Sequence, residues 1–307
     1  MAIEDPGPDE ALVVMSWSCI SRGTERLVFE GRVPISERER MRAPLQEGEF
    51  SFPVKYGYCA VGRVEAGPEK WLGRNVFCLH PHQDRFVAPL GLLCSIPDNI
   101  APRRATLAAN METALNGLWD SGAGPGDRIV VIGAGLVGLL IAALAGELPG
   151  AEVTVVDAEP ARASIAKLIG ARFISEAEFR STCRDEADVV FHCSGTQAGL
   201  SLALACAGFE ATIVEMSWYG DALLNLPLGG GFHANRLRLI SSQVGHVSPS
   251  RRPRWSFARR LGKALELLGS DQFDALITEE VSFDDLARDL PRILASDAQG
   301  VATVVRY

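Results

Sequence analysis

Hydrophobic and polar positions follow two different patterns along the chain, and the pattern changes near residue 115. Up to residue 110, short β-prone runs such as ALVVMSWSCI, NVFCLH and RFVAP are separated by Gly, Pro and Asp. Short apolar runs bounded by turn-forming residues are typical of β-strands. We therefore predict an irregular, β-rich first domain.

Beyond residue 115, strand-like and helix-like runs alternate. RIVVIG, EVTVVDA and DVVFHCSG have the character of buried strands, and LVGLLIAALAGEL, EPARASIAKLIG and GLSLALACAG have that of helices. Such alternation predicts a parallel sheet covered by helices on both faces, and hence an α/β fold class.

The tail of the chain returns to isolated elements. ALITEEVSF, DDLARDLPRIL and VATVVRY predict a strand, a helix and a last strand, which we assign to the first domain. The predicted domains are residues 1–115 with 270–307, and a doubly wound domain over residues 116–269.

Composition narrows the classes of partner. The 307 residues are 47% hydrophobic and 22% charged, and the formal charge is −8. This charge disfavours non-specific binding to nucleic acid or anionic lipid, so we expect a small-molecule partner. The acidic start MAIEDPGPDE predicts no signal peptide and a cytoplasmic protein, whose seven scattered cysteines are expected to be reduced.

A glycine motif predicts a dinucleotide site. VVIGAGLVG places Gly133, Gly135 and Gly138 between a β-branched strand and an apolar helix. The first glycine permits a tight turn, the second lets the backbone approach a pyrophosphate, and the third lets the helix pack on the strand. Leu136 and Val137 lie at the helix N-terminus, which faces the anion.

Asp157 ends the next predicted strand, where a carboxylate bonds the adenosine ribose and repels a 2′-phosphate. NAD is therefore favoured over NADP, although Arg162 lies nearby and leaves NADP open. Further cofactor contacts are expected after the later strands. They are Ser194, Gly195, Met216 and Ser242, whereas we interpret His192 and Cys193 as core residues.

A β-rich first domain, a glycine motif in the second domain and a tail that returns to the first domain follow one another along the chain. In this arrangement the chain resembles the medium-chain dehydrogenase/reductase superfamily, the zinc-type alcohol dehydrogenases and their relatives. The segments SCISRGTERLVFEGRVP, PVKYGYCAVGRVEAG and FCLHPHQDRFVAP are most similar to the compact branch that includes bacteriochlorophyllide a dehydrogenase. The resemblance implies a GroES-like catalytic domain, a Rossmann domain and homodimerisation.

Zinc members of that family carry metal ligands that this chain lacks. Ser21 stands at the first cysteine position, with Thr24 and Glu25 following. Tyr58 and Cys59 replace a His-Glu pair, and Ala109 or Asn110 falls at the last cysteine position. We predict that neither family zinc site exists, although a set formed by Cys19, Cys59, His80 and His82 stays open.

An enzyme without zinc needs another donor at the substrate oxygen. By resemblance Tyr58 lies near that oxygen, and its phenol could donate a hydrogen bond. Second choices are Thr24, Ser21, His82 and Glu112. The alternative for Tyr58 is an aromatic ring that packs beside the strand.

Three functions remain open. The first is a zinc-independent, NAD-dependent oxidoreductase that interconverts an alcohol and a carbonyl on a small or medium substrate, for which we favour a cyclic one. The second is a C=C or quinone reductase, whose relatives use NADPH. The third is a non-catalytic NAD-binding protein with a decayed metal site.

Overall fold

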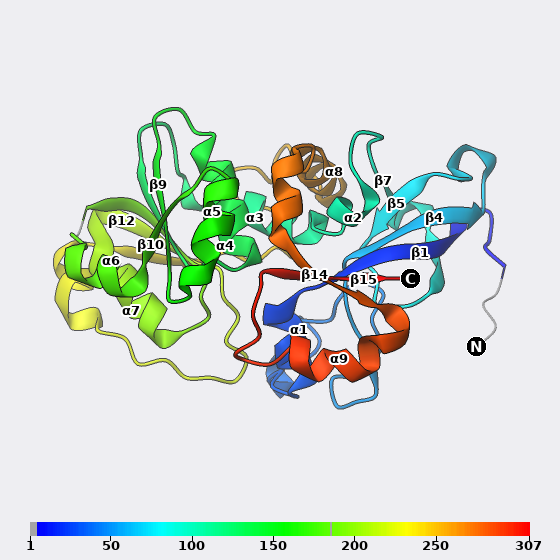
Figure 1. Ribbon diagram of the computed structural model, residues 1–307, viewed down its shortest axis with the longest axis horizontal. Coiled ribbons are helices and arrows are strands. Elements are labelled where there is room, and N and C mark those ends of the chain that lie inside the picture. The colour runs from blue at the N-terminus through cyan, green and yellow to red at the C-terminus, as the bar shows by residue number, and fades with distance from the viewer. Residues whose placement is uncertain (1–4, 185) are drawn as a thin grey trace. The chain divides into compact units, whose positions relative to one another are not determined.

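The computed structural model describes residues 5–184 and 186–307, and these form two compact units (Figure 1). Unit 2 is Asn110–Ser256, and unit 1 combines the residues up to Ala109 with those from Phe257 onward. Helix α8 (Phe257–Leu267) therefore belongs to unit 1, whereas we predicted residues up to 269 in the nucleotide domain. The helix packs against β7 (Cys94–Ser95), a partner that its own sequence pattern does not identify.

Unit 1 is built on a mixed sheet. Among the described residues it has seven strands in the order β14-β15-β1-β4-β5-β7, with β6 also paired to β1. β14 and β15 are parallel, whereas β1 is antiparallel to β15, β4 and β6. The bounds not yet given are β1 (Glu10–Ile20), β4 (Ala60–Ala66), β5 (Asn75–Cys78), β6 (Arg85–Pro89), β14 (Ile277–Ser282) and β15 (Ala302–Arg306). A separate pair joins β2 (Glu47–Gly48) to β3 (Val54–Lys55).

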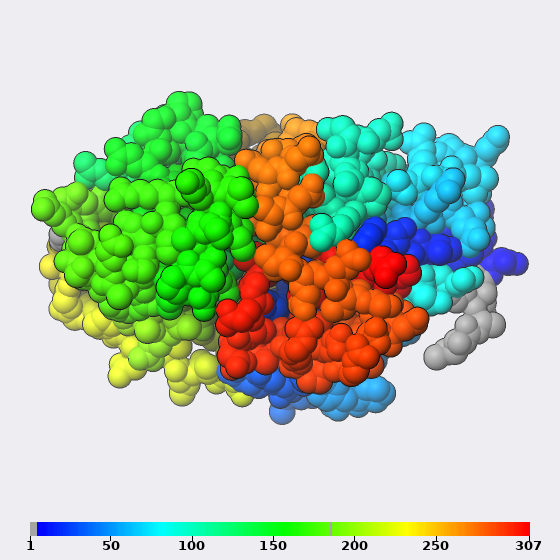
Figure 2. Space-filling view, viewed as in Figure 1, coloured from blue at the N-terminus to red at the C-terminus, as the bar shows by residue number. Residues whose placement is uncertain are grey.

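Residues from the two chain segments share the core of unit 1. Alternate side chains of β1, namely Ala11, Val13 and Met15, are buried, as the pleat of a strand requires. A second cluster joins Ile20 to Val281, Ile293 and other residues of the C-terminal segment. On the surface of unit 1, Figure 2 shows the orange and red C-terminal segment beside the blue N-terminal segment.

Helix α1 (Arg22–Phe29) was not predicted, because we assigned its region to the irregular β domain. Ser21 precedes the helix, and its backbone N–H donates to Glu25 Oε1 at 2.7 Å, which satisfies one of the free donors at the helix start. The other helices of unit 1 include α2 (Pro102–Ala105) and α9 (Leu286–Ile293), the latter in the predicted segment DDLARDLPRIL.

Unit 2 is a doubly wound parallel sheet, which confirms the predicted α/β class. Among the described residues its strands have the order β10-β9-β8-β11-β12-β13, and every adjacent pair is parallel. The strands are β8 (Arg128–Ile132), β9 (Glu152–Asp157), β10 (Arg172–Ser175), β11 (Ala187–His192), β12 (Ala207–Glu215) and β13 (Arg238–Ser241). The direction of winding reverses between β8 and β11, where such sheets bind ligands at the carboxyl ends of the strands.

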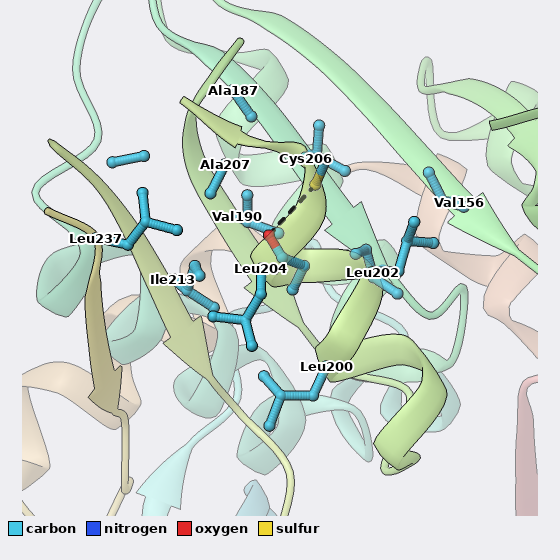
Figure 3. Close-up of a cluster of buried hydrophobic side chains, with 14 of the residues drawn as sticks. Val156, Ala187, Val190, Leu200, Leu202, Leu204, Cys206, Ala207, Ile213 and Leu237 are labelled. Carbon is cyan, nitrogen blue, oxygen red and sulfur yellow. Dashed lines mark hydrogen bonds between the residues drawn. The ribbon is translucent and has the colours of Figure 1, made fainter. Parts of the chain in front are cut away.

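The helices of unit 2 include α3 (Ala108–Ser121), which begins at the division between the units, α4 (Leu136–Gly146), α5 (Ala163–Leu168), α6 (Glu176–Thr182) and α7 (Gln197–Cys206). Leu200, Leu202 and Leu204 of α7 pack against Val190 and Ile213 of the sheet (Figure 3). This apolar layer fixes α7, and with it the turn between β11 and α7.

Two further observations bear on the sequence expectations. All seven cysteines are reduced, as expected. Among the described residues, no helix combines the length and apolar character needed to cross a membrane.

Candidate functional site

The glycine loop of unit 2 has the shape that the motif predicts. Gly133 has φ +107°, and a Cβ there would lie 2.7 Å from the backbone N of Ser194. A Cβ on Gly138 would overlap the carbonyl oxygen of Gly133, so only glycine lets α4 approach the strand this closely. Above Gly135 there is room, because Arg162 Nη1, at 3.8 Å, is the only contact that a Cβ there would make among the described residues.

Asp157 and Arg162 both hold the loop. The Asp157 carboxylate accepts from the backbone N–H of Ala134 at 2.6 Å and from that of Glu159 at 2.8 Å. Arg162 Nη1 donates to the Ala134 carbonyl at 2.9 Å and lies 3.9 Å from Asp157 Oδ2.

The Nε atom of Arg162 is buried without a hydrogen-bond partner among the described residues. An open glycine cradle beside an orphaned guanidinium donor fits an anionic pyrophosphate. A carboxylate oxygen with a spare lone pair fits a ribose hydroxyl. The residues of unit 2 therefore fit a dinucleotide.

The next strand ends carry a polar network. His192 Nδ1 lies 2.9 and 2.8 Å from the two carboxylate oxygens of Glu215, and Nε2 lies 2.7 Å from Ser194 Oγ. The backbone N–H of Gly195 donates to Ser217 Oγ at 3.0 Å. His192 is fully buried, as we predicted for a core residue, but both of its ring nitrogens have polar partners.

Met216 and Ser242, both expected near the cofactor, have contacts inside unit 2. The Met216 side chain fills the space next to Gly117, where a Cβ would lie 2.7 Å from its sulfur. Ser242 Oγ donates its hydroxyl proton at 2.7 Å to Oδ2 of Asp120, a residue of helix α3. That cofactor role for Ser242 stays a prediction.

A second polar group lies in unit 1, around Glu25. His82 Nε2 lies 3.1 Å from Glu25 Oε2, and His82 Nδ1 lies 2.8 Å from Ser18 Oγ. Ser18 Oγ is also 3.1 Å from the hydroxyl of Tyr307. Both side chains of the Glu25–His82 pair are largely buried, with 7% and 11% of their areas exposed. Burial strengthens this pair because water screens it little.

Helix α1 is anchored so that Glu25 faces this group. Arg26 donates from Nε to the Leu294 carbonyl at 2.6 Å and from Nη2 to the Ala295 carbonyl at 2.7 Å. These carbonyls follow α9, so the C-terminal segment fixes the helix that carries Glu25.

Ser21 and Tyr58, two of the predicted site residues, lie in the same group as Glu25. They share a side-chain hydrogen bond, and the Tyr58 ring lies edge-on to Tyr56, with ring centroids 6.0 Å apart. Burial, followed by the neighbouring Tyr56, Cys59 and Glu25, raises the pKa of Tyr58 well above its usual range. The phenol therefore keeps its proton near neutral pH and can donate it in a hydrogen bond.

The remaining two predicted catalytic residues lie elsewhere. Thr24 is half-buried on α1, next to Glu25. Glu112 is buried in α3 and belongs to unit 2, so neither unit by itself brings it together with Tyr58.

The residues at the family's zinc positions fit a metal poorly. Ser21 and Tyr58 offer a hydroxyl and a protonated phenol, and burial, followed by Cys19 and Glu25, raises the pKa of Cys59, whereas metals bind the thiolate. The described residues contain no group of three or more His, Cys, Asp or Glu side chains placed to hold a metal. Zinc independence itself stays a prediction.

A surface hollow of unit 2 lies away from the glycine loop. It is lined by Arg128, Glu152 and Arg172, which begin three of the parallel strands. Ligands of such sheets bind at the opposite, carboxyl ends, so we assign no reaction to this hollow.

Glu25, Ser18, Tyr307 and Glu215 were not among the predicted site residues. Glu215 could have been found, because it ends the strand next to His192, and carboxyl ends of adjacent parallel strands meet. Tyr307 carries no local signal, since it reaches Ser18 only through the pairing of β15 with β1.

Known proteins match both units. Residues 137–260 match the family described as zinc-binding dehydrogenase. A sorbitol dehydrogenase from Ovis aries is 25% identical over 201 residues, which are 61% of this chain and 53% of the relative. An uncharacterized zinc-type alcohol dehydrogenase-like protein from Haemophilus influenzae is 28% identical over 208 residues, 64% of this chain and 56% of the relative. The chain thus spans about half the length of these curated relatives.

Solved structures share the fold over the whole chain. A Sinorhizobium meliloti protein, described as a zinc-binding dehydrogenase and bound to NADP, has a TM-score of 0.80 at 18% identity and covers 100% of this chain and 94% of its own. Galactitol-1-phosphate dehydrogenase from Escherichia coli has a TM-score of 0.77 at 18% identity, with 100% and 95% covered. At this identity the solved structures show that the chain shares their fold, and the match to the zinc-binding dehydrogenase family covers residues 137–260.

Proposed function

We propose that the protein is an NAD-dependent oxidoreductase that interconverts an alcohol and a carbonyl without a catalytic zinc. The observation that carries the proposal is the glycine cradle of unit 2, with Asp157 at its edge and the orphaned Nε of Arg162 beside it. The sorbitol and galactitol-1-phosphate dehydrogenases among its relatives favour polyols and other small or medium alcohols as the substrate class.

Hydride transfer is the chemistry that a nicotinamide supplies when bound, and the protein must handle the accompanying proton. Tyr58 is proposed to hold the substrate oxygen, because its protonated phenol donates to a carbonyl oxygen and accepts from an alcohol. The Glu25–His82 pair provides nearby atoms that can hold the proton released by an alcohol. In zinc enzymes of this kind the metal lowers the pKa of the alcohol. Here Tyr58 and the Glu25–His82 pair are proposed to assist removal of the alcohol proton instead.

The cofactor is proposed to be NAD because Asp157 would repel a 2′-phosphate. Arg162 lies 3.9 Å from that carboxylate and weakens the repulsion. We expect NADH to bind more tightly than NADPH, which fluorescence titration of the purified protein measures directly.

Three variants test the roles in unit 1. Tyr58→Phe, His82→Gln and Glu25→Gln should each lower kcat on an alcohol and carbonyl panel by about 10²- to 10⁴-fold, the usual contribution of acid–base groups. The matched control is His80→Gln, because His80 lies two residues before His82 but stacks on Phe86 instead of joining the Glu25 group. This control should keep near-wild-type turnover at pH 7.5.

Two results would contradict the proposal in different ways. Stoichiometric zinc in the purified enzyme, with activity lost to a chelator, would show that zinc does the work assigned to Tyr58. Tight NADH binding without turnover on any alcohol or carbonyl would instead favour a non-catalytic NAD-binding protein.

A further inference from the structure

Two cysteines of unit 2 lie at the ends of different helices and are close to each other. Cys183 directly follows α6, where its backbone N–H donates to the Phe179 carbonyl at 2.6 Å, and Cys206 is the last residue of α7. The two thiols share a side-chain hydrogen bond, and Cys183 packs against the apolar cluster that contains Cys206. Two helices that are separate in the sequence thus bring two sulfur atoms together.

The two thiols differ in their exposure. Cys206 is 1% exposed and lies in the apolar cluster between α7 and the sheet (Figure 3), whereas Cys183 is half-buried. Each sulfur also lies 3.5 Å from a backbone carbonyl oxygen, Cys206 from that of Ala203 and Cys183 from that of Arg184. A thiol is a weak donor, so these contacts do not prevent the Cys183 side chain from turning towards Cys206.

A surface hollow connects this pair to the solvent. Both cysteines line the hollow at the starts of β8, β9 and β10, and Cys183 also lines a second hollow beside Phe232. These strand starts lie at the edge of the sheet opposite the glycine loop. The hollow acts here as an opening and not as a binding site, and a small neutral oxidant that enters it meets the more exposed Cys183.

A second pair of cysteines shows why access matters. The backbone N–H of Cys19 donates to the Cys59 carbonyl at 3.2 Å, so these two residues are also neighbours, but both are fully buried in unit 1. Burial raises the pKa of each of these thiols. Buried, protonated thiols are inert, so we expect oxidation at Cys183 and not at this pair.

We propose that Cys183 and Cys206 are a modification site, at which hydrogen peroxide closes a disulfide between the ends of α6 and α7. Cys183 is the residue that peroxide oxidises, and Cys206 is the residue that then forms the bond. A dithiol reductant reopens it. This inference goes beyond the proposed function and does not depend on it.

The reaction has two balanced steps. The Cys183 thiolate attacks one oxygen of hydrogen peroxide and the O–O bond breaks, which gives the sulfenic acid of Cys183 and hydroxide. The Cys206 sulfur then attacks the sulfur of this sulfenic acid, so that the S–S bond forms, the S–O bond breaks and the hydroxyl group leaves as water with the Cys206 proton. In total two thiols lose two electrons and two protons, and one peroxide becomes two waters.

The surroundings of Cys206 suit the second step. The hydrogen bond with Cys183, followed by burial, raises the pKa of Cys206 well above its usual range. A thiol that keeps its proton reacts slowly with peroxide. Cys206 therefore stays intact until a sulfenic acid lies next to it, and that sulfenic acid should persist long enough to be trapped.

The first experiment maps the disulfide in the full-length wild type. The reduced protein is treated with a small excess of hydrogen peroxide, its remaining thiols are blocked with N-ethylmaleimide in urea, and it is digested without reductant. Trypsin releases Cys183 in residues 181–184, and chymotrypsin cuts at the leucines of α7 between Cys193 and Cys206. We expect residues 181–184 to be linked to the Cys206 peptide, and dithiothreitol to release them. Oxidation of Cys183 without this link would overturn the inference.

The second experiment tests the order of the steps. In Cys206→Ala the sulfenic acid of Cys183 has no thiol to react with, so dimedone should label Cys183 more strongly than in the wild type. In Cys183→Ser, Cys206 should remain reduced after the same treatment. Cys94→Ser is the matched control, because it removes a partly exposed thiol of unit 1 and should leave the link at its wild-type yield.

Three outcomes would contradict the proposal. Oxidation of Cys206 in Cys183→Ser to the wild-type extent would show that Cys183 is not the residue that reacts first. A link from Cys183 to Cys193, which lies beyond the far end of β11, would show that the folded arrangement does not select the partner. Wild type unfolded in urea before the peroxide is added should give several-fold less of the Cys183–Cys206 link, and an equal yield would mean that closeness in the sequence is the cause.

Discussion

At the scale of single residues, burial of His80 makes the stability of the fold depend on pH. Its ring stacks on Phe86 with centroids 3.7 Å apart, and burial lowers its pKa below the ordinary value of 6.5. The unfolded chain therefore binds a proton more readily than the folded one. Neutral His80 stabilises the fold above pH 6.5, and this contribution is lost as the pH falls through the folded-state pKa.

We predict that His80→Gln reduces this acid sensitivity. The urea midpoint of the wild type should fall more between about pH 7.5 and 5.5 than that of the variant, because the variant has no proton to take up at this site. His233→Gln, which changes an exposed histidine, is the control and should keep the wild-type slope. Equal slopes for His80→Gln and the wild type would contradict the prediction.

Residues that act through backbone geometry could be predicted, and residues that act through distant partners could not. Local spacing identifies Gly133, Gly138 and Asp157 in the sequence, because the turn, the close helix approach and the loop contact that need them all lie within neighbouring strands and helices. Glu25 has no such spacing. Its partner His82 comes from a loop 57 positions away, and only the folded sheet brings the two together.

At the scale of elements, the contact between α4 and β8 depends on one missing methyl group. Gly138→Ala would push a Cβ into the Gly133 carbonyl oxygen. We expect the variant to lose about 1–3 kcal/mol of unfolding free energy, as overpacked sites do, and to bind NADH more weakly because the loop shifts. Thermal unfolding and NADH titration measure the two effects.

Gly146→Ala provides the matched control on the same helix. Gly146 is exposed at the end of α4, and a Cβ there meets nothing within 4 Å among the described residues. Alanine should therefore be neutral or stabilising by up to about 1 kcal/mol. A similar loss in both variants would show that the close approach at Gly138 is not the cause.

Elements with a strong local pattern were also the predictable ones. The central elements of unit 2, such as β8 and α4, bury most of their residues, so their type can be predicted from long apolar runs in the sequence. Helix α1 is short and holds its place through Arg26 and the Leu294 carbonyl, a bond between distant segments that no local pattern contains.

At the scale of the whole molecule, Arg104 ties the two chain segments of unit 1 together. Its guanidinium is buried and donates to Asp274 through Nε at 2.9 Å and Nη2 at 2.7 Å, and to Asp271 through Nη2 at 2.5 Å. This side-by-side pairing with Asp274 is the strong geometry for arginine and carboxylate. The Asp271 side chain is 91% exposed and that of Asp274 is 45% exposed, so water weakens the attraction and the hydrogen bonds contribute more than the charges.

We predict that Arg104→Met lowers the free energy of unfolding by about 1.5–3 kcal/mol, the range for hydrogen bonds to charged groups. Arg103→Met is the control, because Arg103 makes a 3.5 Å surface pair with Glu280 and should cost at most about 1 kcal/mol. Denaturant unfolding of the full chain checks both values. Equal losses would mean that the two segments are held together by apolar packing alone.

The division of the chain into units shows the limit of prediction at this scale. The switch from β-rich to alternating sequence indicates that two domains exist. The sequence of helix α8, however, does not predict which of the two domains the helix packs in. In the structure the helix packs against β7 and so belongs to unit 1.

The placement of β15 between β14 and β1 has a consequence for how the protein is made. The sheet of unit 1 closes only when residues from opposite ends of the chain meet, and Ser18 and Tyr307 are 289 positions apart. Unit 2 is continuous, so a ribosome releases all of it before the last strand of unit 1 is synthesised. Until then β1 lacks one neighbour and exposes an unpaired edge, the kind of surface that chaperones protect and that aggregates when left bare. Closure of such distant contacts is slow, so we expect unit 2 to fold before unit 1, which holds Tyr58.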